Sequence, residues 1–256
     1  MEAQPLLYTV KNKVASLVIN REPQRNALTH ETLSLFMRRL DEAEADSGVR
    51  AVAVSGAGEK AFCSGADLAG AAGGDMKKAF GDYAALLKRI VSFPKPTAAI
   101  VNGHCMAGGM GLMLACDIVI AKDTAKFGTP EANVGLWPMM IGALIYRNAP
   151  RKKAMEMMLL GKKMDAAQAL DMGLVTRIVP PQKLAVEAEA LLKELASKSP
   201  IGMKIGKRAF YEMQDMPFEK ALDFLSGKIA EVAATEDARE GIMAFLEKRK
   251  PSFTGK

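Results

Sequence analysis

The chain has 256 residues, of which 49% are hydrophobic and 25% are charged, and these ordinary proportions exclude disorder as its main state. No apolar run reaches the roughly 18–20 residues of a membrane-spanning helix, and residues 1–5 lack the features of a secretory signal. The formal net charge of +6 is mild. The basic residues are dispersed and have no aromatic stacking positions beside them, which disfavours nucleic acid as the main partner.

Cysteine and histidine are scarce. The three cysteines, Cys63, Cys105 and Cys116, are too few for a disulfide framework and indicate free thiols in a reducing compartment. His30 and His104 have no ligand-spaced cysteine near them, so we expect no zinc site. Together these observations favour a cytoplasmic protein without a metal.

Strands and helices alternate through the first two-thirds of the chain. Hydrophobic alternation predicts a hairpin from residues 7–11 and 14–20, and then a helix from about Thr29 with Leu33, Phe36, Leu40 and Ala43 on one face. Short apolar runs predict buried strands at 51–55, 96–101 and 118–121. Helices are expected at 76–93 and 108–116.

From about residue 140 the pattern is helical, except for a strand at 175–179. The expected helices lie near 151–160, 165–172, 183–198, 201–214, 218–234 and 236–248. The fold class is therefore α/β with a helical C-terminal extension. We expect this extension to pack on the core or on a neighbouring subunit rather than to form a free domain.

One glycine pattern favours a nucleotide site only weakly. Residues 56–61 match G-x-G-x-x-A after a strand, which is the outline of a dinucleotide fingerprint. That fingerprint must open a helix, whereas residues 62–65 (FCSG) form helix poorly. A nicotinamide-dependent oxidoreductase is therefore disfavoured.

Two other glycine-rich turns, at residues 61–68 and 102–111, each follow a buried strand, and the second runs into a helix. Small residues let a ligand approach the backbone, and a helix N-terminus presents free N–H groups to it. Side by side, two such turns would form an oxyanion hole. The alternative is that the glycines serve only tight turns and close helix packing.

Glu131 follows the turn at residues 127–130 and precedes an apolar stretch at 134–145. A carboxylate in apolar surroundings has a raised pKa and can exchange protons near neutral pH. The alternative is an ordinary acid in a surface loop.

Three segments, at residues 60–68 (KAFCSGADL), 95–121 and 127–138 (FGTPEANVGLWP), resemble the crotonase superfamily, also called the enoyl-CoA hydratase/isomerase family, in order and spacing. Residues 20–28, 161–180 and 240–253 extend the resemblance over essentially the whole chain. It implies a crotonase-like spiral of ββα turns over residues 1–195. Residues 196–256 would be a helical region, not an independent domain, that supports trimerisation and CoA contacts. A homotrimer or hexamer is implied.

The resemblance implies an acyl-CoA thioester substrate, with no cofactor beyond the coenzyme A that the substrate carries. The family's two oxyanion N–H donors fall on Ala66 and Gly108, and its acid/base fits Glu131. The CoA contacts that it implies fall on Arg25, Ala27, Lys60, Ser64, Asp67, Phe245 and Lys248. Lys60 and Lys248 would meet CoA phosphates as point charges.

The sequence departs from the family's hydratases at one position. They use two glutamates, and the first of these falls on Gly111 while the second falls on Glu131. A single acid suits a proton shuttle that isomerises a double bond, although hydration by Glu131 with a bound water stays open. The dehalogenase branch is disfavoured because its nucleophilic aspartate falls on Met139.

The candidate acyl pocket has a methionine-rich lining, and methionine accommodates acyl chains of varied shape. Ordinary core packing is the alternative role for these residues. They are Met106, Met110, Gly111, Trp137 and Met139. A non-catalytic or moonlighting acyl-CoA- or RNA-binding member of the same fold is the alternative function, and the missing first acid motivates it.

Overall fold

The computed structural model describes residues 4–67 and 75–256 and is built around a six-stranded sheet. Its strands, in spatial order, are β1 (Leu6–Lys11), β2 (Val14–Ile19), β3 (Ala51–Gly56), β5 (Thr97–Val101), β7 (Ile118–Lys122) and β10 (Arg177–Val179). β1 and β2 pair antiparallel, and each later neighbour pairs parallel. The predicted hairpin and buried strands are confirmed, and the last strand begins two residues later than expected.

A second, smaller sheet was not predicted. It contains β4 (Ala61–Cys63), β6 (His104–Met106), β8 (Lys126–Gly128) and β9 (Met164–Asp165). β4, β6 and β8 pair parallel, and β9 joins β8 antiparallel. Strands of two or three residues show no measurable alternation, so the sequence pattern indicated only turns in these places.

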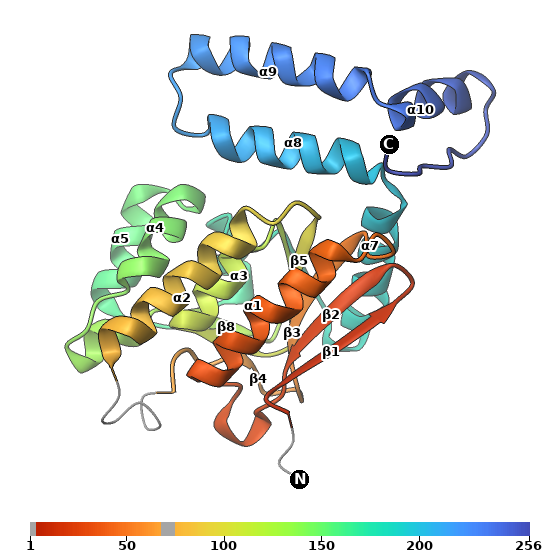
Figure 1. The fold of residues 1–256 in the computed structure, drawn as a ribbon. Helices are drawn as coiled ribbons and strands as arrows, with labels where there is room; N and C mark the ends of the chain where they lie inside the picture. Colours follow the sequence, from red (N-terminus) through yellow and green to blue (C-terminus); the bar gives the residue numbers. More distant parts are fainter. Residues whose placement is uncertain (1–3, 68–74) are drawn as a thin grey trace.

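Helices α1 (His30–Ala45), α2 (Met76–Val91) and α3 (Gly108–Ala115) share one large hydrophobic core with the sheets. In α1 the predicted apolar face is buried, and its N-cap Thr29 accepts a hydrogen bond from the N–H of Thr32 at 3.2 Å. α1 and α2 lie alongside each other against the core (Figure 1). Three of the predicted helices are thereby confirmed.

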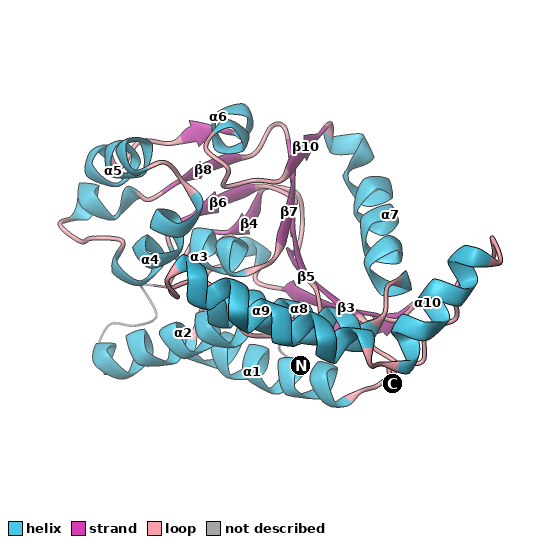
Figure 2. Ribbon diagram, turned by 90° about the horizontal axis from the view of Figure 1, so that it is seen from above, coloured by secondary structure: helices cyan, strands magenta, loops and turns pink. Residues whose placement is uncertain are grey.

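Helix α7 (Leu184–Ser197) covers the opposite face of the six-stranded sheet, away from α1 and α2 (Figure 2). Its Leu184, Ala188 and Leu191 pack on Ala98 and Ile120 of that sheet. A group of shorter elements surrounds the second sheet: η2 (Pro130–Val134), α4 (Met139–Asn148), α5 (Arg151–Leu160) and α6 (Ala166–Asp171). Two further single-turn 3-10 helices are η1 (Glu22–Gln24) and η3 (Pro181–Lys183).

The C-terminal helical region contains α8 (Pro200–Met213), α9 (Phe218–Ala233) and α10 (Glu236–Leu246). α8 and α9 form an antiparallel pair above the core (Figure 1). α7 ends at Ser197 and α8 begins at Pro200, and the boundary expected at residues 195–196 stays a prediction. None of the helices in residues 4–67 and 75–256 combines the length and apolar character that a membrane crossing needs.

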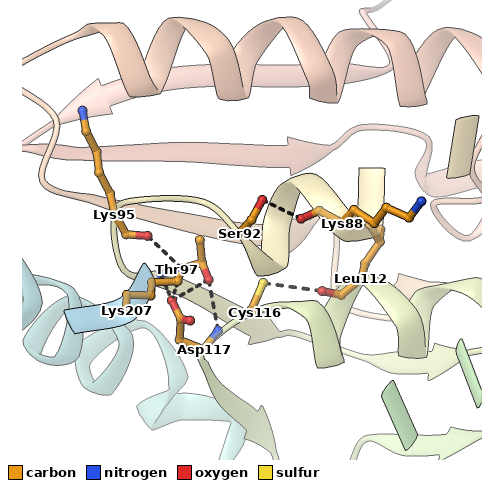
Figure 3. A network of polar contacts seen from close by, with 8 residues as sticks. All are labelled: Lys88, Ser92, Lys95, Thr97, Leu112, Cys116, Asp117 and Lys207. Atoms are coloured by element: carbon orange, nitrogen blue, oxygen red, sulfur yellow. Dashed lines mark hydrogen bonds and ion pairs between the residues drawn. The ribbon is translucent and has the colours of Figure 1, made fainter. Parts of the chain in front are cut away.

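A polar network fastens α8 to the core (Figure 3). The Lys207 Nζ lies 2.6 Å from the Asp117 carboxylate and donates to the Lys95 carbonyl at 3.1 Å. The same Asp117 carboxylate accepts hydrogen bonds from the backbone N–H and the hydroxyl of Thr97, at 2.7 and 2.8 Å. Because Asp117 precedes β7 and Thr97 begins β5, the network joins α8 to the starts of two interior strands of the six-stranded sheet.

Candidate active site

Three chain segments that the sequence singled out meet at one edge of the second sheet. β4, β6 and β8 are parallel neighbours, so the residues that follow them emerge at the same edge. These residues are the turn at 64–67, the start of α3 at 107–108 and the turn into Glu131. The N–H of Ala107 donates to the carbonyl of Gly128 at 2.9 Å, which joins the second of these segments to the third.

The first segment presents the amide of Ala66. The N–H of Leu28 donates to the Gly65 carbonyl at 2.8 Å, and the N–H of Asp67 donates to the Leu28 carbonyl at 2.9 Å. In a parallel bridge of this kind, the residue between the two bonded positions directs its own N–H to the opposite side. The N–H of Ala66, an exposed residue, therefore faces away from Leu28.

Arg21 stabilises this turn through two contacts of its side chain. Its guanidinium donates to the Ala27 carbonyl at 2.7 Å and pairs with the Asp67 carboxylate at 2.9 Å. Both side chains of the pair are less than one-fifth exposed. The two contacts therefore hold residues on either side of the Leu28–Ala66 bridge.

The second segment presents the amide of Gly108, the first residue of α3. The first N–H groups of a helix have no partner inside the helix, and the helix dipole adds partial positive charge there. Ala107 has a positive φ of 49°, a backbone conformation that side chains with a Cβ rarely adopt.

The two segments touch through Gly65. A Cβ on Gly65 would lie 2.7 Å from the Cβ of Ala107 and 3.0 Å from the nitrogen of Gly108. Gly65 also has a positive φ of 99°, which favours glycine. The structure therefore brings the turns of Ala66 and Gly108 side by side. They can approach this closely because Gly65 has no side chain.

Glu131 lies in η2, directly after the turn that follows β8. Its side chain is half-buried, and its Oε2 is buried without a hydrogen-bond partner among the described residues. Loss of water raises the pKa of the Glu131 carboxyl, which a hydrogen bond from its own backbone N–H partly opposes. An upward shift of the pKa is what the apolar residues after Glu131 in the sequence predict. A carboxylate with a raised pKa accepts a proton more readily than one in water.

Tyr83 of α2 occupies the space beside Gly111, and sequence reasoning missed it. A Cβ on Gly111 would lie 2.1 Å from the Tyr83 hydroxyl oxygen and 2.5 Å from Cγ2 of Ile141. Burial raises the pKa of Tyr83 well above its usual range, and the nearby charge of Glu131 acts in the same direction. At helical spacing from the buried Leu86, Leu87 and Ile90, Tyr83 looks in the sequence like any other core residue.

The candidate CoA contacts divide into three groups. Arg25, Ala27, Ser64 and Asp67 lie around the first turn, where the N–H of Ser64 donates to the Arg25 carbonyl at 3.1 Å. Leu68, the last residue of the motif that predicted this turn, lies outside the described residues. Lys60 lies at the other end of β4, where its carbonyl accepts a hydrogen bond from the N–H of His104 at 3.0 Å, and its CoA contact stays a prediction. Phe245 and Lys248 lie at the end of α10, on the far side of the molecule from β4, β6 and β8 (Figures 1 and 2). Within one chain the structure does not bring these two residues to the turns, and their CoA contact stays a prediction.

The candidate acyl-pocket residues also divide. Met110 and Gly111 are buried, and Met106 is half-buried at the end of β6. Trp137 and Met139 are exposed and line an open groove of about 440 Å³ together with Tyr146. An acyl role for both groups stays a prediction, while core packing accounts for Met110.

No group of three or more His, Cys, Asp or Glu side chains in residues 4–67 and 75–256 is placed to hold a metal ion. The three cysteines are buried and free. Burial raises the pKa of Cys63 to about 12, so the thiol is far from a nucleophilic thiolate at neutral pH. The reactive groups that the described site offers are therefore backbone amides and one carboxylate.

The amino-acid sequence is similar to those of known proteins. The family described as enoyl-CoA hydratase/isomerase matches residues 9–256. A Thermus thermophilus protein assigned to the enoyl-CoA hydratases is 37% identical over 95% of this chain and 98% of its own length. The 2,3-dehydroadipyl-CoA hydratase of Escherichia coli is 33% identical over 98% of this chain and 99% of its own.

Solved structures give the same result. The crystal structure of an enoyl-CoA hydratase from Bacillus anthracis superposes with a TM-score of 0.95, at 30% identity, over 99% of this chain and 100% of that chain. This similarity confirms the expected crotonase fold with its C-terminal helical region. The chain belongs to the enoyl-CoA hydratase/isomerase family, the crotonase superfamily.

Proposed function

We propose that the protein isomerises the double bond of an enoyl-CoA thioester through an enolate. The amides of Ala66 and Gly108 would bind the thioester oxygen, and Glu131 would be the single general acid/base. The observation that carries this proposal is the buried Oε2 of Glu131, which has no hydrogen-bond partner among residues 4–67 and 75–256 and lies at the end of the second sheet where the turns of Ala66 and Gly108 follow their strands. The family membership supports an enzyme that acts on an acyl-CoA.

The chemistry requires one proton and no added atom. The Glu131 carboxylate removes a proton from C2 of a 3-enoyl-CoA, and the electron pair delocalises onto the thioester oxygen as a dienolate. The same carboxyl then returns the proton to C4, so that the double bond moves to C2–C3. Each amide donor to such an oxyanion contributes about 3–4 kcal/mol of transition-state stabilisation.

The surroundings of Glu131 favour this role. A desolvated carboxylate is a stronger base than one in water because burial raises its pKa. Position 111 is a glycine, and Tyr83 and Ile141 fill the space beside it, so this position supplies no second carboxylate. A shuttle that uses one carboxyl twice needs no partner there.

Hydration of an enoyl-CoA is the second candidate function. The names of the relatives favour it, including the short-chain-enoyl-CoA hydratase of Clostridium acetobutylicum, 33% identical over 98% of this chain. In that case Glu131 would act on a bound water by itself. The two candidates differ in their product, because hydration adds one water and isomerisation leaves the mass unchanged.

Self-association is part of the proposal. The C-terminal helical region exposes large apolar side chains, among them Phe218 at 77% and Phe245 at 82%. Exposed apolar patches of this kind mark interaction surfaces. A homotrimer or hexamer would cover them and would carry Phe245 and Lys248 to a neighbouring subunit's CoA. The buried free cysteines suit a reducing compartment, and the cytoplasm stays the expected location.

The test is to incubate the protein with trans-3-hexenoyl-CoA and crotonyl-CoA, and to follow mass and conjugated absorbance. Isomerisation gives new absorbance from the first compound at unchanged mass. The Glu131→Gln variant should lose this activity, whereas Glu156→Gln, which removes an exposed carboxylate on α5, should keep it. A mass gain of one water on crotonyl-CoA alone would favour hydration. Tight binding of both esters without any product would favour the non-catalytic alternative.

A further inference from the structure

The start of α3 is intrinsically weak. Its first four residues are Gly108, Gly109, Met110 and Gly111, and each glycine inside a helix destabilises it by roughly 0.8–1 kcal/mol relative to alanine. The helix also has no side-chain N-cap, because Ala107 precedes it. The amide of Gly108 therefore needs support from outside the helix to keep one orientation.

Tyr83 supplies a contact of this kind. Its hydroxyl donates to the Gly108 carbonyl at 2.5 Å. A carbonyl oxygen has two lone pairs, so this bond can coexist with the one that Gly108 accepts inside the helix. The Tyr83 ring also lies against Gly108, because a Cβ there would be 3.5 Å from the ring carbon that bears the hydroxyl.

Gly111 leaves the room in which this hydroxyl lies. A Cβ at position 111 would come within 2.1 Å of the Tyr83 oxygen and would displace it. The three glycines that weaken the helix and the hydroxyl that supports it are therefore parts of one arrangement. Tyr83 is itself fixed, since it is only 9% exposed and belongs to the main core.

We propose that Tyr83 is a positioning residue for the enolate chemistry: its hydroxyl fastens the first turn of α3, and with it the Gly108 amide, in the space that Gly111 leaves open. This inference rests on the proposed function. The role needs both residues, because Tyr83 supplies the hydroxyl and Gly111 leaves the space in which the hydroxyl lies. Tyr83 does not exchange protons in this role, because a buried phenol beside the charge of Glu131 stays neutral.

The experiment uses acetoacetyl-CoA, whose enolate absorbs in the near ultraviolet, as a probe of oxyanion binding that requires no shift of a double bond. We expect Tyr83→Phe, which keeps the ring and removes the hydroxyl, to lower the bound enolate-to-keto ratio about tenfold, because a displaced donor loses part of its transition-state stabilisation. Binding of butyryl-CoA, which stays in its keto form, should change less than twofold. Tyr8→Phe removes a hydroxyl on β1, remote from the turns, and should change neither quantity.

Gly111→Ala tests the same contact without altering Tyr83. It should lower the enolate ratio to a similar extent. In the double variant the contact with the Tyr83 hydroxyl is already lost and only the crowding against Cγ2 of Ile141 remains, so the combined loss in free energy should be smaller than the sum of the two single losses. An unchanged enolate ratio in Tyr83→Phe, or strictly additive losses in the double variant, would overturn the inference while leaving the proposed function intact. Failure of the unaltered protein to bind the enolate would overturn both.

Discussion

Replacing Gly65 by alanine tests whether the two amide-bearing turns must touch. The new Cβ would lie 2.7 Å from the Cβ of Ala107 and 3.0 Å from the nitrogen of Gly108, well inside the usual 3.5–4.0 Å between non-bonded carbons. Something must therefore move, and the movable parts are the segments that carry Ala66 and Gly108.

Two separate effects determine how far Gly65→Ala should lower the free energy of unfolding. A non-glycine residue at the positive φ of Gly65 destabilises the folded state by roughly 1–2 kcal/mol. Crowding of a packed site adds about 1–3 kcal/mol, so the free energy of unfolding should fall by about 2–5 kcal/mol. A displacement of the donors by about 1 Å should lower kcat roughly 100-fold.

Urea unfolding followed by circular dichroism measures the first effect, and turnover of 3-hexenoyl-CoA measures the second. The matched control is Gly81→Ala in α2, where a Cβ would have no atom within 4 Å. That change should raise stability by about 0.5–1 kcal/mol and leave kcat unchanged. Wild-type stability and activity in Gly65→Ala would refute the reasoning.

Four further predictions concern charge and burial. Because loss of water raises the pKa of Glu131, kcat/KM should increase as pH rises through that raised pKa. The same desolvation penalises the ionised form, so Glu131→Gln should be at least as stable as wild type at pH 7. It should lose that advantage once the pH falls below the range where Glu131 ionises. A difference in melting temperature between the two proteins that stays constant from pH 3 to 8 would contradict this. Asp117→Ala should destabilise the fold more than Lys207→Met, since the carboxylate also serves both donors of Thr97, and equal melting temperatures would refute it. Burial raises the pKa of Cys63 to about 12, so at pH 8 this thiol should react with a disulfide reagent only after denaturant is added.

Much of the fold follows from local patterns. The hairpin, the three longer buried strands and the amphipathic helices have enough residues for alternation or helical spacing to appear, and Leu33, Phe36, Leu40 and Ala43 are buried as their spacing predicts. β4, β6, β8 and β9 could not be found in this way, because two or three residues next to glycine carry no period. Their pairing depends on partner residues that lie 22 to 43 positions away in the chain.

The residue types at the site can be found from the amino-acid order alone: two glycine-rich turns, one glutamate after a Thr-Pro turn, and a glycine at position 111 where the family's hydratases have a second acid. The contact of the two turns through Gly65, and the lack of a partner for the Glu131 Oε2 within the described part of the chain, come from the three-dimensional structure. It also decided that Tyr83 fills the space beside Gly111. Van der Waals contact and desolvation depend on the separation of atoms. Tyr83 and Gly111 lie 28 positions apart in the chain, and Gly65 and Ala107 lie 42 apart, so these residues come into contact only when the parallel strands pair and the core closes around them.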